Sequence, residues 1–241
     1  MKSIIKSSLV FVSFSISSSL YAGVIELEEL GLFVNANGWT ESAGDMQIGD
    51  PLNNFGSRGL GISYSSSLNS ENVGTVTWRV ENNSGVTLND VRVFSYLNAD
   101  IDFSTNTFYN EHASYIGNTS AQSFEIDEPG YVFGDIFQNL LAGSLDNSNA
   151  ITSQSPEDVS FALGFNLGDF GIGSWFEATV EISLSDIGGI EHIDSDSNFS
   201  FFSNTFLTRS AVAVSEPSVL SLFFVGVLVV VGNRRIQKMA V

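Results

Sequence analysis

Cysteine is absent from this chain of 241 residues, which excludes disulfides, thiolate metal sites and cysteine nucleophiles. Histidine occurs only twice, as His112 and His192, and neither stands in an H-E-x-x-H or similar paired-ligand spacing. We therefore expect no zinc enzyme, and we expect both imidazoles to be polar surface groups near Glu111 and Glu191. The G-x-S-x-G turn of serine hydrolases is also missing.

Positive charge is scarce as well, and it is unevenly placed. The region from Gly23 to Val214 holds 26 of the 27 acidic residues but only four basic ones, a net charge of −22. Such a surface repels nucleic-acid phosphates, so nucleic acid is not an expected partner. The remaining basic residues stand at the two ends of the chain, which indicates that the ends have a separate role; they are Lys2, Lys6, Arg234, Arg235 and Lys238.

Long helical periodicity is lacking too, and short apolar segments separated by Gly, Ser, Asn and Thr take its place. Residues 176–184 alternate apolar and polar side chains, which is typical of a half-buried strand. Residues 76–81 and 91–97 flank the turn residues 82–85, so we expect a hairpin there. Further strands are expected at residues 24–34, 60–66, 121–126, 159–165 and 199–208, and a short helix with a polar loop after it at 136–141.

Seven or more strands in one domain predict an all-β fold, an antiparallel β-sandwich of jelly-roll or immunoglobulin-like type. The segments TVTWRVENNSGVTLNDVRVFSYL and FNLGDFGIGSWFEATVEISL resemble, in a generic way, paired strands of immunoglobulin-like modules in bacterial surface proteins. We place the sandwich domain at residues 23–210.

The first 22 residues have the layout of a secretory signal peptide. Lys2 and Lys6 precede the apolar stretch Leu9 to Ile16, and small residues follow it. We expect cleavage between Ala22 and Gly23, which predicts that the mature domain is exported.

An apolar run near the C-terminus, Val219 to Val231, contains 13 residues. Even extended to the 15 residues 218–232, a helix would span about 22 Å, short of the roughly 30 Å hydrocarbon core of a bilayer. We expect an apolar helix that is marginal as a permanent anchor. The basic cluster Arg234, Arg235 and Lys238 would remain on the cytoplasmic side.

The motif Ser215-Glu216-Pro217, followed at once by this apolar run and then by the basic cluster, resembles the PEP-CTERM sorting signal of exported proteins in Gram-negative bacteria. The chain has Ser215 where the family has its first proline. The resemblance covers residues 215–238 and implies an exosortase as the processing partner. It also implies a transient stay in the inner membrane and delivery to the outer surface or extracellular matrix.

Two acidic patterns suggest a hard cation such as Ca²⁺. Oxygen ligands alternate at Asp194, Asp196 and Asn198, although Phe199 stands where an EF-hand needs glycine. Asn98, Asp100 and Asp102 alternate in the same way and would share one face of a strand. A solvated acidic loop without a cofactor is the alternative interpretation of both patterns.

The sequence thus favours a non-enzymatic exported protein of the cell surface or matrix. One alternative is a carbohydrate-binding or adhesive sandwich that contacts extracellular polysaccharide, with sugar rings stacked on aromatic side chains. The candidate aromatics, each of which could equally pack in the core, are Trp39, Tyr109, Tyr115 and Trp175. A second alternative is a secreted hydrolase with two carboxylates that meet only in the folded chain.

Overall fold

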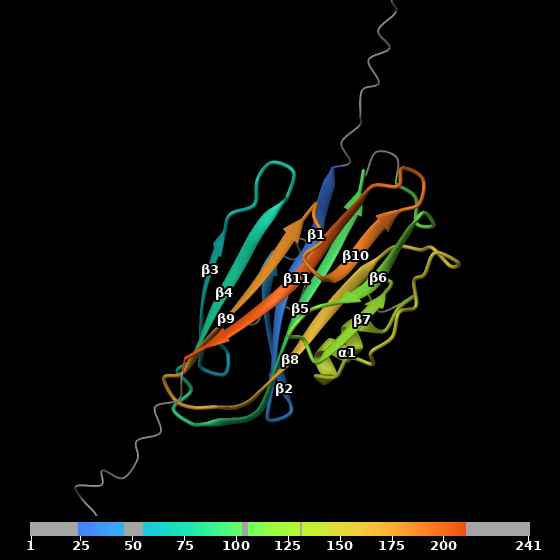
Figure 1. The fold of residues 1–241 in the computed structure, drawn as a ribbon. Coiled ribbons are helices and arrows are strands. Elements are labelled where there is room, and N and C mark those ends of the chain that lie inside the picture. The colour runs from blue at the N-terminus through green and yellow to red at the C-terminus, as the bar shows by residue number, and fades with distance from the viewer. Residues whose placement is uncertain (1–23, 46–54, 103–105, 131, 211–241) are drawn as a thin grey trace, which may run out of the picture.

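A computed structural model describes residues 24–45, 55–102, 106–130 and 132–210 (Figure 1). Its strands form two antiparallel sheets, as the sequence predicts. Sheet A has the order β2 (Trp39–Asp45), β1 (Ile25–Ala36), β5 (Leu88–Ile101), β8 (Ser160–Phe170) and β7 (Ser123–Asp127). Sheet B has the order β3 (Leu60–Ser66), β4 (Gly74–Asn82), β9 (Trp175–Ser183), β11 (Ser200–Arg209), β10 (Gly189–Asp194) and β6 (Glu111–Gly117).

The two sheets share one apolar core. The alternation expected for residues 176–184 is confirmed in β9, where Phe176, Ala178, Val180 and Ile182 are buried and the intervening polar residues are not. Strand β4 repeats the pattern opposite sheet A with a buried Trp78. Each large side chain buried in this way contributes roughly 1.5–3 kcal/mol of hydrophobic stabilisation.

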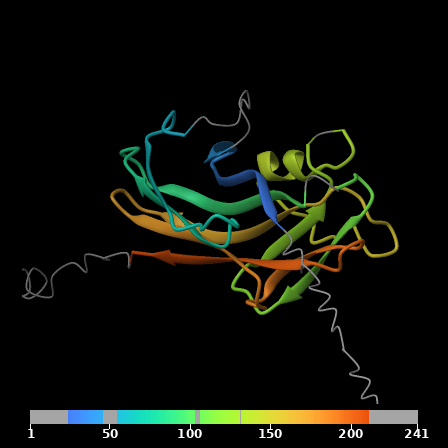
Figure 2. The ribbon, with the colours of Figure 1, turned by 90° about the horizontal axis from the view of Figure 1, so that it is seen from above.

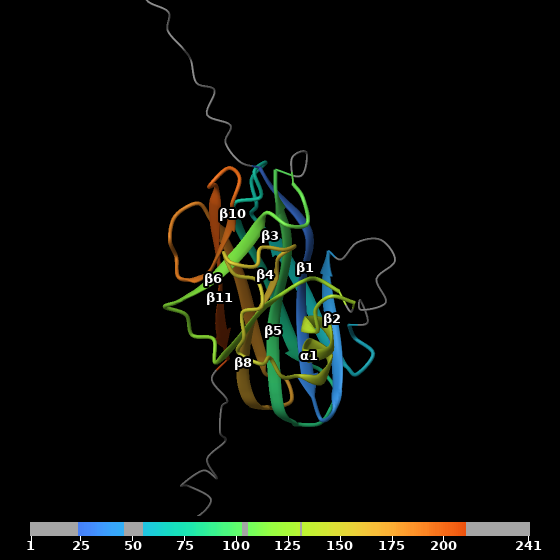
Figure 3. The ribbon, with the colours of Figure 1, turned by 90° about the vertical axis from the view of Figure 1, so that its right-hand side faces the viewer.

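The short helix α1 (Ile136–Ala142) confirms the predicted helix at 136–141 and extends it by one residue. It lies over the face of sheet A that is turned away from β11 (Figures 2 and 3). Its buried side chains Ile136, Phe137 and Leu140 pack with Phe94 and other residues of sheet A in a second, smaller core. Gly143 ends the helix in the left-handed conformation, with φ of 72°.

The predicted hairpin of residues 76–81 and 91–97 is wrong. These segments are β4 and β5, and they belong to different sheets, β4 between β3 and β9 and β5 between β1 and β8. The reason is that β5 is buried on both faces, because it packs on the shared core with one face and under α1 with the other. The connecting segment is held by the buried Asn82, whose Nδ2 donates to the carbonyl oxygens of Val86 and Phe170 at 2.9 and 2.7 Å.

Three strands were not expected from the sequence, namely β2, β6 and β10. Each is only six or seven residues long and carries charged or small residues, as in the segments WTESAGD, EHASYIG and GIEHID. Strands of this kind have no apolar face long enough to stand out in the sequence. They lie at or next to the sheet edges, and pairing with longer neighbours fixes them.

Both predicted processing regions lie outside the described residues. These are the signal segment 1–22 with its cleavage site Ala22–Gly23 and the sorting segment 215–238, including Ser215, Glu216, Pro217, Arg234, Arg235 and Lys238. Within the described ranges no helix has the length and apolarity that crossing a bilayer requires. The fold begins at Val24, whose N–H donates to Asp102 Oδ1 at 2.8 Å while its carbonyl accepts from the Asp102 N–H at 2.9 Å.

Candidate cation site

Three carboxylates from separate segments meet at one end of the two sheets. They belong to Asp100 near the end of β5, Glu111 at the start of β6 and Asp158 just before β8, and an oxygen of each lies within 4.8 Å of the others. Asp100 is 6% exposed, Glu111 is fully buried and Asp158 is half-buried. We call these three residues the acidic cluster.

Backbone pairing brings the three segments together. The Ile101 N–H at the end of β5 donates to Glu111 Oε1 at 2.8 Å. The Glu157 N–H donates to the Glu111 carbonyl at 2.9 Å, which holds the segment before β8 beside β6. Glu111 therefore connects sheet A to sheet B, and Asp158 is placed by its neighbour in the chain.

His192 of β10 supports the cluster from the interior. Its Nε2 lies 3.0 Å from Glu111 Oε2, and both side chains are fully buried. The imidazole packs against the rings of Phe161 and Phe201, with centroid distances of 6.4 and 5.0 Å. The expectation of a surface group is therefore wrong for His192, because it occupies an inward position of β10.

His112 lies on the face of β6 opposite to that of its buried neighbour Glu111, and it is half-buried. Its Nδ1 lies 3.0 Å from Ser195 Oγ. Burial lowers the pKa of this imidazole. The two histidines thus differ in environment, although each directly follows a glutamate in the sequence.

Two further residues adjoin the cluster. Glu28 lies at the β-bulge of β1, between Leu27 and Glu29, and contacts Asp100. Asn98 is 3% exposed, and its Nδ2 donates to Glu28 Oε2 at 3.2 Å. The Oδ1 atom of Asn98 is buried and has no hydrogen-bond partner.

Burial and nearby negative charges shift the pKa values of two carboxyl groups, Asp100 and Asp158, upward. Burial, followed by the charges of Glu28 and Glu111, raises the pKa of Asp100 to about 7. Burial and the charge of Glu111 raise the pKa of Asp158 to about 6. In the described part of the chain the arginine ion pairs are with Glu177 and Asp90, so neither of them neutralises this site.

The predicted set Asn98, Asp100 and Asp102 is brought together only in part. Asn98 and Asp100 do share one face of β5 and both approach Glu28. Asp102 follows the strand in the left-handed conformation, with φ of 53°, and its carboxylate accepts the Val24 N–H instead. Glu111 and Asp158 take its place beside Asp100.

Of the predicted ligands, Asp194 is the last residue of β10, and Asp196 and Asn198 lie in the turn between β10 and β11. Asp194 is buried, and its Oδ1 accepts hydrogen bonds from Asn110 Nδ2 and the Asp196 N–H, at 3.2 and 2.8 Å. Its Oδ2 accepts from Ser197 Oγ at 2.7 Å. The side chains of Asp196 and Asn198 are exposed, so Asp194 serves this turn as a hydrogen-bond acceptor, and calcium binding here stays a prediction.

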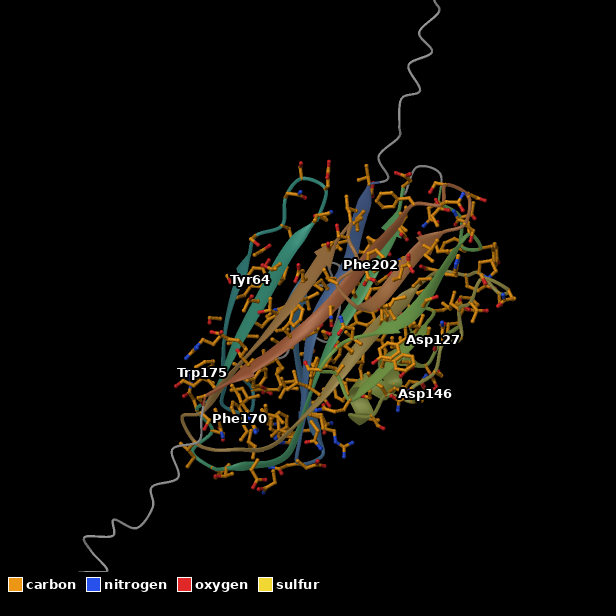
Figure 4. All side chains as sticks on the ribbon, in the orientation of Figure 1. Tyr64, Asp127, Asp146, Phe170, Trp175 and Phe202 are labelled. Carbon is orange, nitrogen blue, oxygen red and sulfur yellow. The ribbon has the colours of Figure 1, made fainter. Side chains whose placement is uncertain are left out.

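A second acidic group lies beside α1, with carboxylate oxygens of Glu125, Asp135 and Asp146 within 4.8 Å of one another. Figure 4 shows Asp146 and the neighbouring Asp127 on this side of the molecule. Glu125 is fully buried and accepts a hydrogen bond from Asn139 Nδ2 at 2.9 Å, whereas Asp135 and Asp146 are exposed. Burial raises the pKa of Glu125 to about 7.

A pocket of about 160 Å³ opens beside the C-terminal end of α1. Phe94, Leu145 and Phe165 line it together with Gly143 and Gly164. Arg92 also lines it, with Nη1 donating to the Gly143 carbonyl at 2.9 Å. Hydroxyl and amide groups in the lining come from Gln122, Ser123, Ser144 and Asn166. The pocket therefore combines an aromatic ring, one cation and several hydrogen-bonding groups.

The four aromatics predicted as sugar-stacking candidates lie apart from this pocket. Tyr109 is 71% exposed, and Trp39 packs partly buried against the main core. Tyr115 of β6 stacks on Phe124 of β7 with a centroid distance of 4.0 Å, joining the edges of the two sheets. Trp175 lies under the guanidinium of Arg79 at 3.8 Å, on the outer face of sheet B (Figure 4). The structure does not assemble the four into one surface.

Sequence reasoning missed Glu28, Glu111 and Asp158 as members of one site. The three residues stand far apart in the chain, and no fixed spacing links them. The sequence shows only that acidic residues such as Asp100 and Asp158 stand at or next to the ends of strands. It does not show which strand ends meet in the folded chain. Comparison with protein-family models, with curated proteins and with solved structures gave no significant match for this chain.

Proposed function

We propose that this chain is an exported protein of the cell surface or extracellular matrix, without catalysis of its own, sorted through its PEP-CTERM-like tail by an exosortase. The observation that carries the proposal is the position of the strands. All of the strands described lie between Ile25 and Arg209, inside the expected cleavage sites at Ala22–Gly23 and around Glu216–Pro217. Removal of both ends therefore takes no strand from either sheet.

The packed sheets support a β-sandwich as the exported domain, and the pairing pattern favours the jelly-roll alternative. Strand β4 pairs with β9, and between them in the chain β5 pairs with β8. Between β5 and β8 in the chain, β6 and β7 lie against one another through the Tyr115–Phe124 stack. Nested pairs of this kind are expected of a folded ribbon of strands, as in jelly rolls, whereas immunoglobulin-like pairs interlock.

Intact mass spectrometry tests the sorting proposal. The full chain is expressed in a Gram-negative host that carries an exosortase, and the mature protein is weighed. We expect a mass that lacks both residues 1–22 and the segment after the Glu216–Pro217 motif. The double variant Glu216→Ala, Pro217→Ala should lose the N-terminal segment but retain the C-terminal one. A wild-type protein that extends through Val241 would contradict exosortase sorting.

Carbohydrate binding is the second candidate function, and the pocket beside α1 favours it. A phenyl ring, a guanidinium and several amides and hydroxyls are the groups that recognise sugars, and an arginine suits an acidic sugar. Ser144→Trp should fill the pocket from its exposed rim, and Ser185→Trp places the same side chain on an exposed residue outside the pocket lining. The wild type and both variants are passed over an immobilised acidic polysaccharide. Retention that Ser144→Trp abolishes and Ser185→Trp preserves would support this function. Equal retention of all three proteins would exclude the pocket as the binding site.

A further inference from the structure

We propose that the acidic cluster, Asp100, Glu111 and Asp158, binds one divalent cation, Ca²⁺, with the Asn98 carbonyl oxygen at its edge. Ca²⁺–oxygen distances of about 2.3–2.6 Å place any two ligands of one ion within roughly 5 Å of each other. The three carboxylates meet this condition, with oxygens within 4.8 Å of one another. The geometry therefore fits a single ion shared by three chain segments.

Unpaired acceptors give an independent reason for a cation. The Oδ1 atoms of Asn98 and of Asp158 are buried and have no hydrogen-bond partner. Asn98 stands two residues before Asp100 on the same face of β5, and its Nδ2 donates to Glu28, which contacts Asp100. A buried acceptor without a partner destabilises the folded state, because it has lost its hydrogen bonds to water. Both of these oxygens are hydrogen-bond acceptors. A cation can bind them, whereas another carboxylate, which is also an acceptor, cannot.

The charges point the same way. With Glu28, four carboxyl groups adjoin one another, and in the described part of the chain no Lys or Arg forms an ion pair with any of them. The ligand set consists of oxygen atoms only, which selects a hard cation over a thiophilic one. Ca²⁺ is favoured over Mg²⁺, because Ca²⁺ accepts irregular geometry while Mg²⁺ requires a near-ideal octahedron.

A bound ion would join elements of both sheets. Asp100 belongs to β5 of sheet A, Glu111 to β6 of sheet B, and Asp158 to the segment that enters β8. The ion would thus hold together one end of a chain that has no disulfide. Its role is structural, and it does not depend on whether the C-terminal tail is processed.

Calorimetric titration and thermal unfolding of the full chain test the site. After dialysis against EGTA, CaCl₂ should bind with one ion per chain, and 1 mM Ca²⁺ should raise the Tm by about 5 °C or more. Asp158→Asn should weaken binding at least about tenfold and should raise the Tm measured in EGTA, because it removes one repelling charge. Asp169→Asn, the same change at an exposed residue of β8, should alter neither quantity.

Several outcomes would overturn the assignment. Absence of binding heat together with equal Tm values in Ca²⁺ and in EGTA excludes the ion. Loss of binding in Asp146→Asn but not in Asp158→Asn would move the site to the acidic group beside α1. Should Asp158→Asn fail to fold, Asp100→Asn serves as the second variant, and a Ca²⁺ response that it leaves intact contradicts the proposal.

Discussion

Among single residues, Glu125 makes the most direct link between burial and pH. Its folded-state pKa of about 7 lies above the value of about 4.3 expected in an unfolded chain, so the folded protein holds a proton that the unfolded chain has lost. The contribution of Glu125 to the free energy of unfolding should therefore be largest below about pH 4.5. It should fall as pH rises from there through 7.

The variant Glu125→Gln tests this link, because glutamine does not ionise and its Oε1 can still accept from Asn139 Nδ2. Between pH 5 and pH 8 it should lose about 1–2 kcal/mol less stability than the wild type in urea unfolding. Glu71→Gln, an exposed residue, should follow the wild-type curve. Parallel curves for all three proteins would show that Glu125 is ionised in the folded state.

At the scale of single elements, α1 is a short helix whose stability depends on packing more than on its own hydrogen bonds. Phe137 is 5% exposed, and its ring lies 5.0 Å from that of Tyr96 in β5. Phe137→Ala should cost about 3 kcal/mol and lower the Tm by about 6–12 °C in a calorimetric scan. Leu141→Ala, on the exposed side of the same helix, should change stability by less than about 0.5 kcal/mol.

The same scale shows where sequence patterns are informative. Strand β9 was predicted because its alternation of apolar and polar residues follows from which side is buried. The partner of β4 could not be predicted, because nothing in the local sequence distinguishes a hairpin turn from a connection between two sheets. Only the apolar residues on both faces in the middle of β5 indicated a central strand. The acidic cluster depends on that same long-range pairing. Asp100 was found as a candidate because it alternates with Asn98, whereas Glu111 and Asp158 carry no such local mark.

For the whole molecule, the main expectation is that the domain is independent of its ends. Residues 23–214 contain all the strands described, and the first described residue, Val24, is held to Asp102 by two hydrogen bonds. A protein of residues 23–214 should therefore unfold cooperatively, with a Tm within about 2 °C of that of the full chain, as followed by circular dichroism. Residues 23–199, which lack β11, should not show this transition, and a stable fold of that shorter chain would contradict the observed strand order.

The position of β11 also bears on the proposed export of the protein. This last strand lies in the interior of sheet B, between β9 and β10, and not at an edge. Sheet B is therefore incomplete until residue 209 is available, and contacts between the first and last parts of the chain form late and slowly. A chain that leaves the cell from its N-terminus would remain unfolded during nearly its whole passage through a secretion channel.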